Sequence, residues 1–117
     1  MKNLVTLIII AFMAINTQSA FAQKAKKTET ITIKTSAQCE MCKERIEKDL
    51  AYEKGIVSSN LDVETQVVTV KYKIAKTTPE KIRIAITKIG YDADDVPAIK
   101  KSHDNLPKCC QKGAHKK

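Results

Sequence analysis

The residues best suited to chemistry are two cysteines three positions apart, Cys39 and Cys42, with Glu40 and Met41 between them. Two thiolates at this spacing can converge on one soft ion of low coordination number, such as Cu(I) or Hg(II). A closed tetrahedral zinc site needs four ligands, and this motif supplies two. The same spacing also occurs in thiol–disulfide exchange proteins, so the motif alone leaves two kinds of chemistry open.

A second cysteine pair, Cys109 and Cys110, lies near the C-terminus, with His103 before it and His115 after it. Adjacent cysteines rarely form a disulfide with each other, because the small ring strains the peptide between them. We expect a candidate secondary metal site here, which either stands alone or adds its sulfurs to the site at Cys39. The second arrangement is within reach, because a flexible linker of about 12 residues spans roughly 20 Å. The alternative is a solvated tail whose cysteines have no role or bridge another chain.

The cysteine motif is expected where a strand leads into a helix. Residues 30–34 alternate apolar and polar side chains, which indicates a half-buried strand. Cys42, Ile46 and Leu50 then repeat every four residues, which predicts a helix from residue 40 to about residue 53. Cys39 therefore falls in the loop and Cys42 in the first helical turn. The positive end of the helix should hold one thiol pKa, that of Cys42 by position, below about 8.5.

The remaining elements complete a βαββαβ order. Residues 56–63 and 67–72 read as two strands joined by a tight turn. A second helix is expected between the cap at Thr78 and the stop at Gly90, and residues 91–98 read as a short edge strand. This order predicts an α+β, ferredoxin-like fold, with two helices on one face of a four-stranded antiparallel sheet. The expected core consists of Ile31, Ile33, Ile46, Leu50, Val68, Val70, Ile82, Ile86 and Ile89.

The N-terminus has the three parts of a secretory signal peptide at residues 1–22: the cation Lys2, an apolar run, and a small-residue cleavage box ending at Ala22. The apolar run is shorter than the ~20 residues that a bilayer span needs, so no stable membrane insertion is expected after cleavage. The mature protein is then expected in the periplasm or secreted. At 117 residues, the chain has room for one small domain.

The net charge of +8 lies mostly at the two ends of the mature chain. Residues 23–28 form a basic linker, and residues 99–117, a basic tail containing Cys and His, carry six Lys and one Asp. Basic tails can contact nucleic acid, but no Phe or Trp follows Phe21 to stack on bases. We therefore expect solvated tails and no nucleic-acid partner.

Residues 29–98 resemble the heavy-metal-associated domain, the family of copper chaperones, periplasmic mercuric-ion-binding proteins and modules of metal-transporting ATPases. The resemblance rests on residues 36–42, on the helix that follows, and on residues 88–93. It implies an aromatic ring, that of Tyr91, packed beside the metal loop. The family usually has Met where this chain has Ala37, and Met41 is available to fill the resulting space.

Together with the signal peptide, which predicts export, the resemblance implies a non-enzymatic protein that binds a soft ion, with Cu(I) as the first candidate, through Cys39 and Cys42 and passes it on by thiolate ligand exchange. It also implies a metal-transporting ATPase or other metal-handling protein as partner, and a monomer or a metal-bridged dimer. The alternatives are a periplasmic mercuric-ion scavenger of the same fold and a thiol–disulfide exchange protein. Against thiol–disulfide exchange, this sequence lacks the Trp and the Pro that thioredoxin-like sites carry, and its order of strands and helices differs from theirs.

Overall fold

A computed structural model describes residues 27–113 of the chain. The predicted signal peptide, most of the basic linker and His115 lie outside the described residues. Within the described part, no helix has the length and apolar character that crossing a membrane requires.

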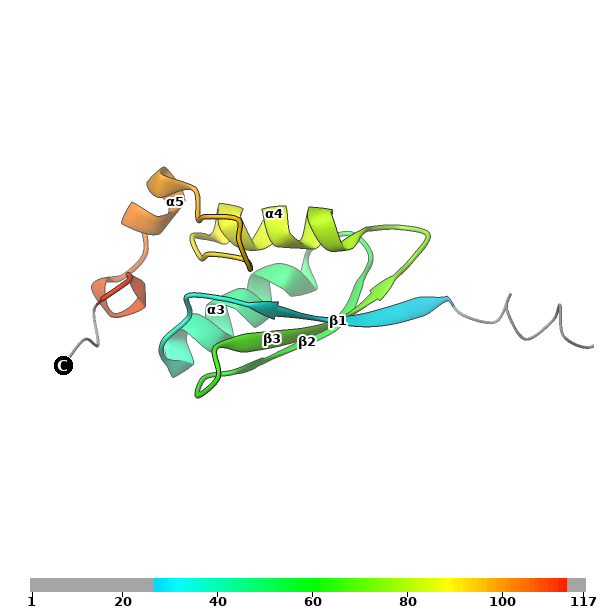
Figure 1. The fold of residues 1–117 in the computed structure, drawn as a ribbon, viewed down its shortest axis with the longest axis horizontal. Helices are drawn as coiled ribbons and strands as arrows, with labels where there is room; N and C mark the ends of the chain where they lie inside the picture. Colours follow the sequence, from blue (N-terminus) through cyan, green and yellow to red (C-terminus); the bar gives the residue numbers. More distant parts are fainter. Residues whose placement is uncertain (1–26, 114–117) are drawn as a thin grey trace, which may run out of the picture.

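Three antiparallel strands form the sheet, in the order β1-β3-β2 (Figure 1). They are β1 (Thr28–Lys34), β2 (Ile56–Asp62) and β3 (Val67–Lys73). In β3, Val68, Val70 and Tyr72 are buried while the residues between them are exposed, as expected for a sheet with one solvated face. The two predicted hairpin strands and the first strand are therefore confirmed to within two residues at their ends.

Two helices lie side by side over the buried face of the sheet (Figure 1). The first, α3 (Glu40–Ala51), buries Cys42, Ile46 and Leu50, which are the residues whose spacing predicted it. The second, α4 (Pro79–Ile89), begins after Thr78, whose side chain accepts a hydrogen bond from the Lys81 backbone N–H at 3.3 Å. Seven of the predicted core residues are buried, and Ile31 and Ile89 pack against that core at its edge.

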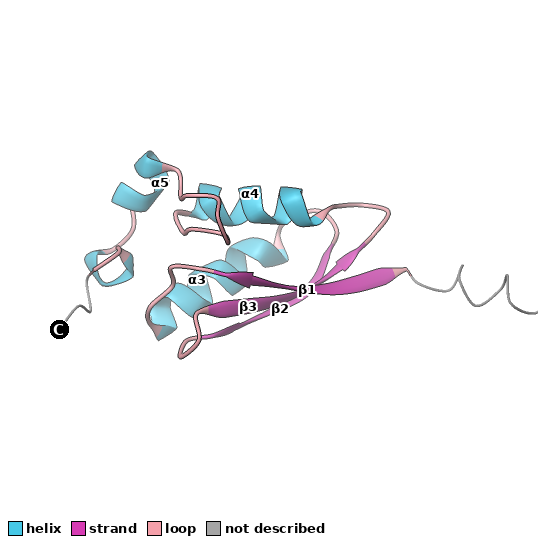
Figure 2. Cartoon of the chain, viewed as in Figure 1, coloured by secondary structure: helices cyan, strands magenta, loops and turns pink. Residues whose placement is uncertain are grey.

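The predicted fourth strand over residues 91–98 does not form in the described structure, where this segment is a loop (Figure 2). A single bridge joins Thr35 to Ala93, and the chain then turns at Asp94, whose φ is 53°. The Asp94 carboxylate accepts the Lys34 backbone N–H at 2.9 Å, which is the donor that a fourth strand would have used. Pro97 removes a further backbone donor. The Asp94 backbone N–H also donates to the Lys34 carbonyl at 2.8 Å, so one backbone bond to β1 forms before the chain turns away and the pairing ends.

The Asp94 carboxylate also accepts a hydrogen bond from Arg83 Nε at 2.8 Å. Burial raises the pKa of this carboxyl, but the bonds from Arg83 and from the Lys34 backbone outweigh burial and hold the pKa below its ordinary value. A lowered pKa stabilises the fold above about pH 4, and this contribution disappears as the pH falls through the folded-state pKa.

Asp94→Asn removes the negative charge that pairs with Arg83, so we expect it to lower the free energy of unfolding near neutral pH. The expected loss is only about 1 kcal/mol, because this ion pair is partly exposed to solvent. Urea unfolding of both proteins at several pH values measures this difference. The gap should close in acid, where the wild-type carboxyl is protonated. A gap of the same size at every pH would show that the charge of Asp94 has no part in it.

Residues 100–113 pack on the domain, whereas the sequence predicted a flexible linker leading to the second cysteine pair. They form α5 (Lys100–Asp104) and the short 3-10 helix η2 (Lys108–Cys110). Leu106 and Cys110 are buried at 5% and 1% exposure and belong to the core of the domain. Burial of these two side chains offsets the conformational entropy lost when the segment becomes ordered.

Candidate metal centre

Cys39 and Cys42 lie at the N-terminal end of α3, as the sequence predicted. Cys39 is the residue before the first helical turn and has an extended backbone. Its sulfur lies 3.1 Å from the sulfur of Cys42. Cys42 is fully buried, whereas Cys39 is only partly covered. The pair therefore offers one sulfur inside the core and one at its edge, 3.6 Å from the Cys109 carbonyl oxygen.

Cys110 brings a third sulfur to the same place from the C-terminal segment. The sulfurs of Cys39, Cys42 and Cys110 all lie within 4.8 Å of one another, so together they could hold a metal ion. All four cysteines lie in the described part of the chain, and none of them is in a disulfide. The segment thus folds back onto the first site, which is one of the two arrangements the sequence left open.

Cys109 lies on the outer side of this three-cysteine group. Its sulfur is 3.8 Å from that of Cys110 and 3.6 Å from that of Met41. Met41 is 51% exposed, so it does not fill the space beside the buried Ala37. The sequence-based suggestion that Met41 fills this space is wrong, because the side chain points outward from the helix start.

His103 does not join the three-cysteine group. Its Nδ1 atom lies 3.3 Å from an Asp104 carboxylate oxygen, and its Nε2 atom accepts the Lys112 backbone N–H at 3.1 Å. Both ring nitrogens therefore have neighbours within the C-terminal segment. His115, the other histidine considered as a ligand, lies outside the described residues.

The three thiols of the group differ in how readily they ionise. Burial raises the pKa of Cys42, but hydrogen bonds from the Gln38 backbone and from neighbouring side chains outweigh it, so the pKa lies below its ordinary value. Burial raises the pKa of Cys39 and takes that of Cys110 to about 12. Cys42 is thus the thiol most disposed to be a thiolate, in the direction predicted from its position in the first helical turn.

Tyr91 is fully buried directly beside the sulfurs. Among the described residues, no group completes a hydrogen bond of good geometry to its hydroxyl, and its polar neighbours are Cys42 and Cys110. Burial, followed by the proximity of these sulfurs, raises the pKa of Tyr91, so the hydroxyl keeps its proton. A protonated hydroxyl aimed at two sulfurs can donate to whichever of them becomes a thiolate.

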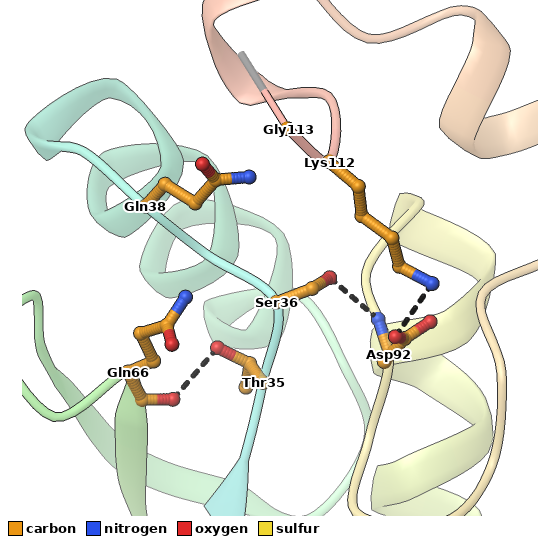
Figure 3. A pocket seen from close by; sticks show the side chains of 7 residues that line it. All are labelled: Thr35, Ser36, Gln38, Gln66, Asp92, Lys112 and Gly113. Carbon is orange, nitrogen blue, oxygen red and sulfur yellow. Dashed lines mark hydrogen bonds and ion pairs between the residues drawn. The ribbon is translucent and has the colours of Figure 1, made fainter. Parts of the chain in front are cut away.

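Polar side chains that the sequence analysis did not single out hold the cysteine loop in place. Thr35 Oγ1 donates to the Gln66 carbonyl at 2.8 Å, and Gln66 Nε2 donates to the Ala37 carbonyl at 2.8 Å. Ser36 Oγ accepts the Asp92 backbone N–H at 2.9 Å (Figure 3). Their partners lie 29 to 56 positions away in the sequence, so no local pattern could have identified them.

Comparison with known proteins identifies the domain that carries this site. The heavy-metal-associated domain matches residues 28–92, which include the cysteine motif and the helix that follows it. The chain belongs to the heavy-metal-associated domain family. Residues 100–113, including Cys110, lie beyond the matched region.

A curated relative in this family is the probable copper-importing P-type ATPase A of Enterococcus hirae, 37% identical over 67 residues, or 57% of this chain. The chain spans only a small part of the curated relatives that it matches, 9% of this ATPase and 21% of another protein. The similarity is thus to one domain of each larger protein.

Two solved structures share the fold over nearly their whole length. The CopZ metallochaperone is 26% identical, with a TM-score of 0.53 over 56% of this chain and 98% of that protein. Oxidized MerP from Ralstonia metallidurans CH34 is 25% identical, with a TM-score of 0.55 over 57% of this chain and 94% of MerP. The described fold is therefore that of small metal-handling proteins of this family.

Proposed function

We propose that this protein is an exported metal-binding protein that captures Cu(I) through Cys39 and Cys42 and passes it on by thiolate exchange. The observation that carries the proposal is the placement of two sulfurs 3.1 Å apart at the start of α3, in a heavy-metal-associated domain. Thiolates are the ligands that Cu(I) prefers, and a helix N-terminus favours the thiolate over the thiol.

The different exposure of the two sulfurs supports transfer rather than permanent storage. Cys42 is buried and has the lowered pKa, so it serves as the anchor for the ion. Cys39 lies at the edge of the core, where a thiolate from another protein can approach. The partner's sulfur adds to the ion while Cys39 leaves, so the ion passes through a shared intermediate without being released into water.

Copper is proposed ahead of mercury because, of the two curated relatives, the one with the higher sequence identity (37% against 34%) is named as a probable copper-importing ATPase. Hg(II) is the alternative cargo, since it is also a soft ion that prefers thiolates. A metal-transporting ATPase or another metal-handling protein is the proposed partner, and the protein acts as a monomer or a metal-bridged dimer. The predicted signal peptide supports a place in the periplasm or outside the cell.

Thiol–disulfide exchange is the competing function, since two sulfurs 3.1 Å apart need little movement to form a disulfide. Native mass spectrometry of the protein, purified anaerobically and titrated separately with Cu(I) and Hg(II), distinguishes these functions. We expect one tightly held Cu(I) per chain, with glutathione exchange slow once the ion is bound. A protein that takes up neither ion but exchanges rapidly with oxidised glutathione would contradict the proposal.

A further inference from the structure

We infer that Cys110 is a third thiolate ligand in the same chain, and that residues 100–113 form a strap that holds it on the site. The inference rests on the proposed function, because it concerns the same bound ion. It goes beyond it because Cys110 lies outside the matched heavy-metal-associated domain, which ends at residue 92.

The three sulfurs are spaced for a three-coordinate soft ion. When three thiolates bind one ion in a trigonal plane with bonds of about 2.3 Å, their sulfurs lie about 4.0 Å apart. The Cys39–Cys42 distance of 3.1 Å is shorter than this, and no pair in the group exceeds 4.8 Å. Small side-chain adjustments of less than about 1 Å would therefore suit Cu(I) or Hg(II) bound by three thiolates.

The buried Tyr91 hydroxyl lies beside two of these three sulfurs. It is aimed at Cys42 and Cys110 without a hydrogen bond of good geometry from any described residue. A buried hydroxyl is costly to leave unsatisfied. Ionisation of Cys110 on metal binding would give that hydroxyl a charged acceptor.

The strap is attached to the domain by packing on the turn that follows α4. Leu106 lies against Gly90, where a Cβ atom would come within 3.0 Å of the Leu106 Cγ atom. The Ile99 backbone N–H also donates to the Thr87 carbonyl at 3.1 Å. These contacts place the start of η2, and therefore Cys110, beside the cysteine loop at the same end of the domain (Figure 1).

Polar contacts attach the strap on the other side of Cys110, across the hollow drawn in Figure 3. Lys112 Nζ lies 2.7 Å from an Asp92 carboxylate oxygen. Gln38 Nε2, from the residue before Cys39, donates to the Gln111 carbonyl at 3.1 Å. Cys110 is thus held between an apolar anchor and two polar ones, so its nearness to the other sulfurs does not depend on chance encounters of a flexible tail.

A third thiolate from the same chain changes how the ion is transferred. In a two-thiolate site the third coordination position is open to a partner's sulfur. Here Cys110 occupies that position, so a partner must first displace it. The strap therefore slows the loss of the ion to competing thiols, and release of the strap becomes the step that permits transfer.

X-ray absorption spectroscopy of the full chain, loaded anaerobically with Cu(I), counts the sulfur ligands directly. We expect three sulfurs in the wild type and two in Cys110→Ser, with Cu(I) affinity about 10- to 100-fold lower in the variant. Cys109→Ser is the matched control, because it removes the neighbouring thiol, and it should keep three sulfurs. Cys110→Ala, which places no hydroxyl in the core, should reproduce the Cys110→Ser result.

A second measurement tests the strap. Transfer of Cu(I) to a soluble dithiol chelator should be faster from Cys110→Ser and Cys110→Ala than from the wild type or Cys109→Ser. Two sulfurs in the wild type, with unchanged affinity and transfer in the Cys110 variants, would overturn the inference and leave the proposed function standing. Failure of the wild type to bind Cu(I) or Hg(II) would instead remove the proposed function itself.

Discussion

Cys39→Ser is expected to lower Cu(I) affinity by more than about 100-fold while leaving the fold intact. Loss of a residue that only orients a metal ligand already costs about 10- to 100-fold, so loss of a direct ligand should cost more. Cys39 is suited to this test because its side chain lies at the edge of the core. Competition with a Cu(I) chelator of known affinity measures the loss, and circular dichroism monitors the fold.

The matched control lies two residues further on, in the first turn of α3. Met41→Leu removes a half-exposed sulfur with little change in volume, and the Cu(I) affinity should be unchanged. Cys42→Ser should lose binding as Cys39→Ser does, but with about 1–3 kcal/mol lower stability, because its hydroxyl would be buried in the core. Wild-type affinity in Cys39→Ser would refute the central role of this cysteine pair.

Gly90→Ala is expected to destabilise the domain strongly and to release the strap. Gly90 has a φ of 121°, which side chains rarely adopt, and its Cβ would lie 2.9 Å from the Ser102 carbonyl oxygen. Backbone strain of this kind costs about 1–3 kcal/mol, which corresponds to a fall in Tm of roughly 10 °C in a domain of this size. The Leu106 contact must also open, so Cys110 should become reactive toward an alkylating reagent.

Gly113→Ala separates backbone strain from the loss of packing. Gly113 also has a positive φ, of 81°, but a Cβ there would meet nothing within 4 Å. We expect a smaller fall in Tm and continued protection of Cys110. Thermal unfolding and mass-spectrometric mapping of alkylated cysteines read both effects. If Cys110 stayed protected in Gly90→Ala, the Leu106–Gly90 contact could not be what holds the strap.

The sequence by itself determined the elements that depend on neighbouring residues. The four-residue spacing of Cys42, Ile46 and Leu50 predicted α3 and so placed the cysteine motif at a helix start. The cap at Thr78 predicted the start of α4. Helix periodicity and capping are local properties, since a helix bonds residues four positions apart.

The fourth strand was decided by contacts that no local pattern contains. The apolar residues after Gly90 favoured a strand, but the Asp94 carboxylate bonds to the Lys34 backbone N–H from 60 positions away. The backbone pairing with β1 starts at Asp94, whose N–H donates to the Lys34 carbonyl, but the chain turns at the same residue, so the pairing goes no further. Local propensity was therefore overridden by the turn at Asp94, which tertiary hydrogen bonds to Lys34 hold in place.

The role of the second cysteine pair was likewise decided only by the tertiary structure. The sequence showed that Cys109 and Cys110 could reach the first site, but chain statistics treat both sulfurs alike. In the folded chain the Cys110 sulfur lies with those of Cys39 and Cys42, whereas the Cys109 sulfur lies beside Met41. The packing of the whole C-terminal segment therefore decided which of two adjacent thiols enters the site, because their side chains leave the backbone in different directions.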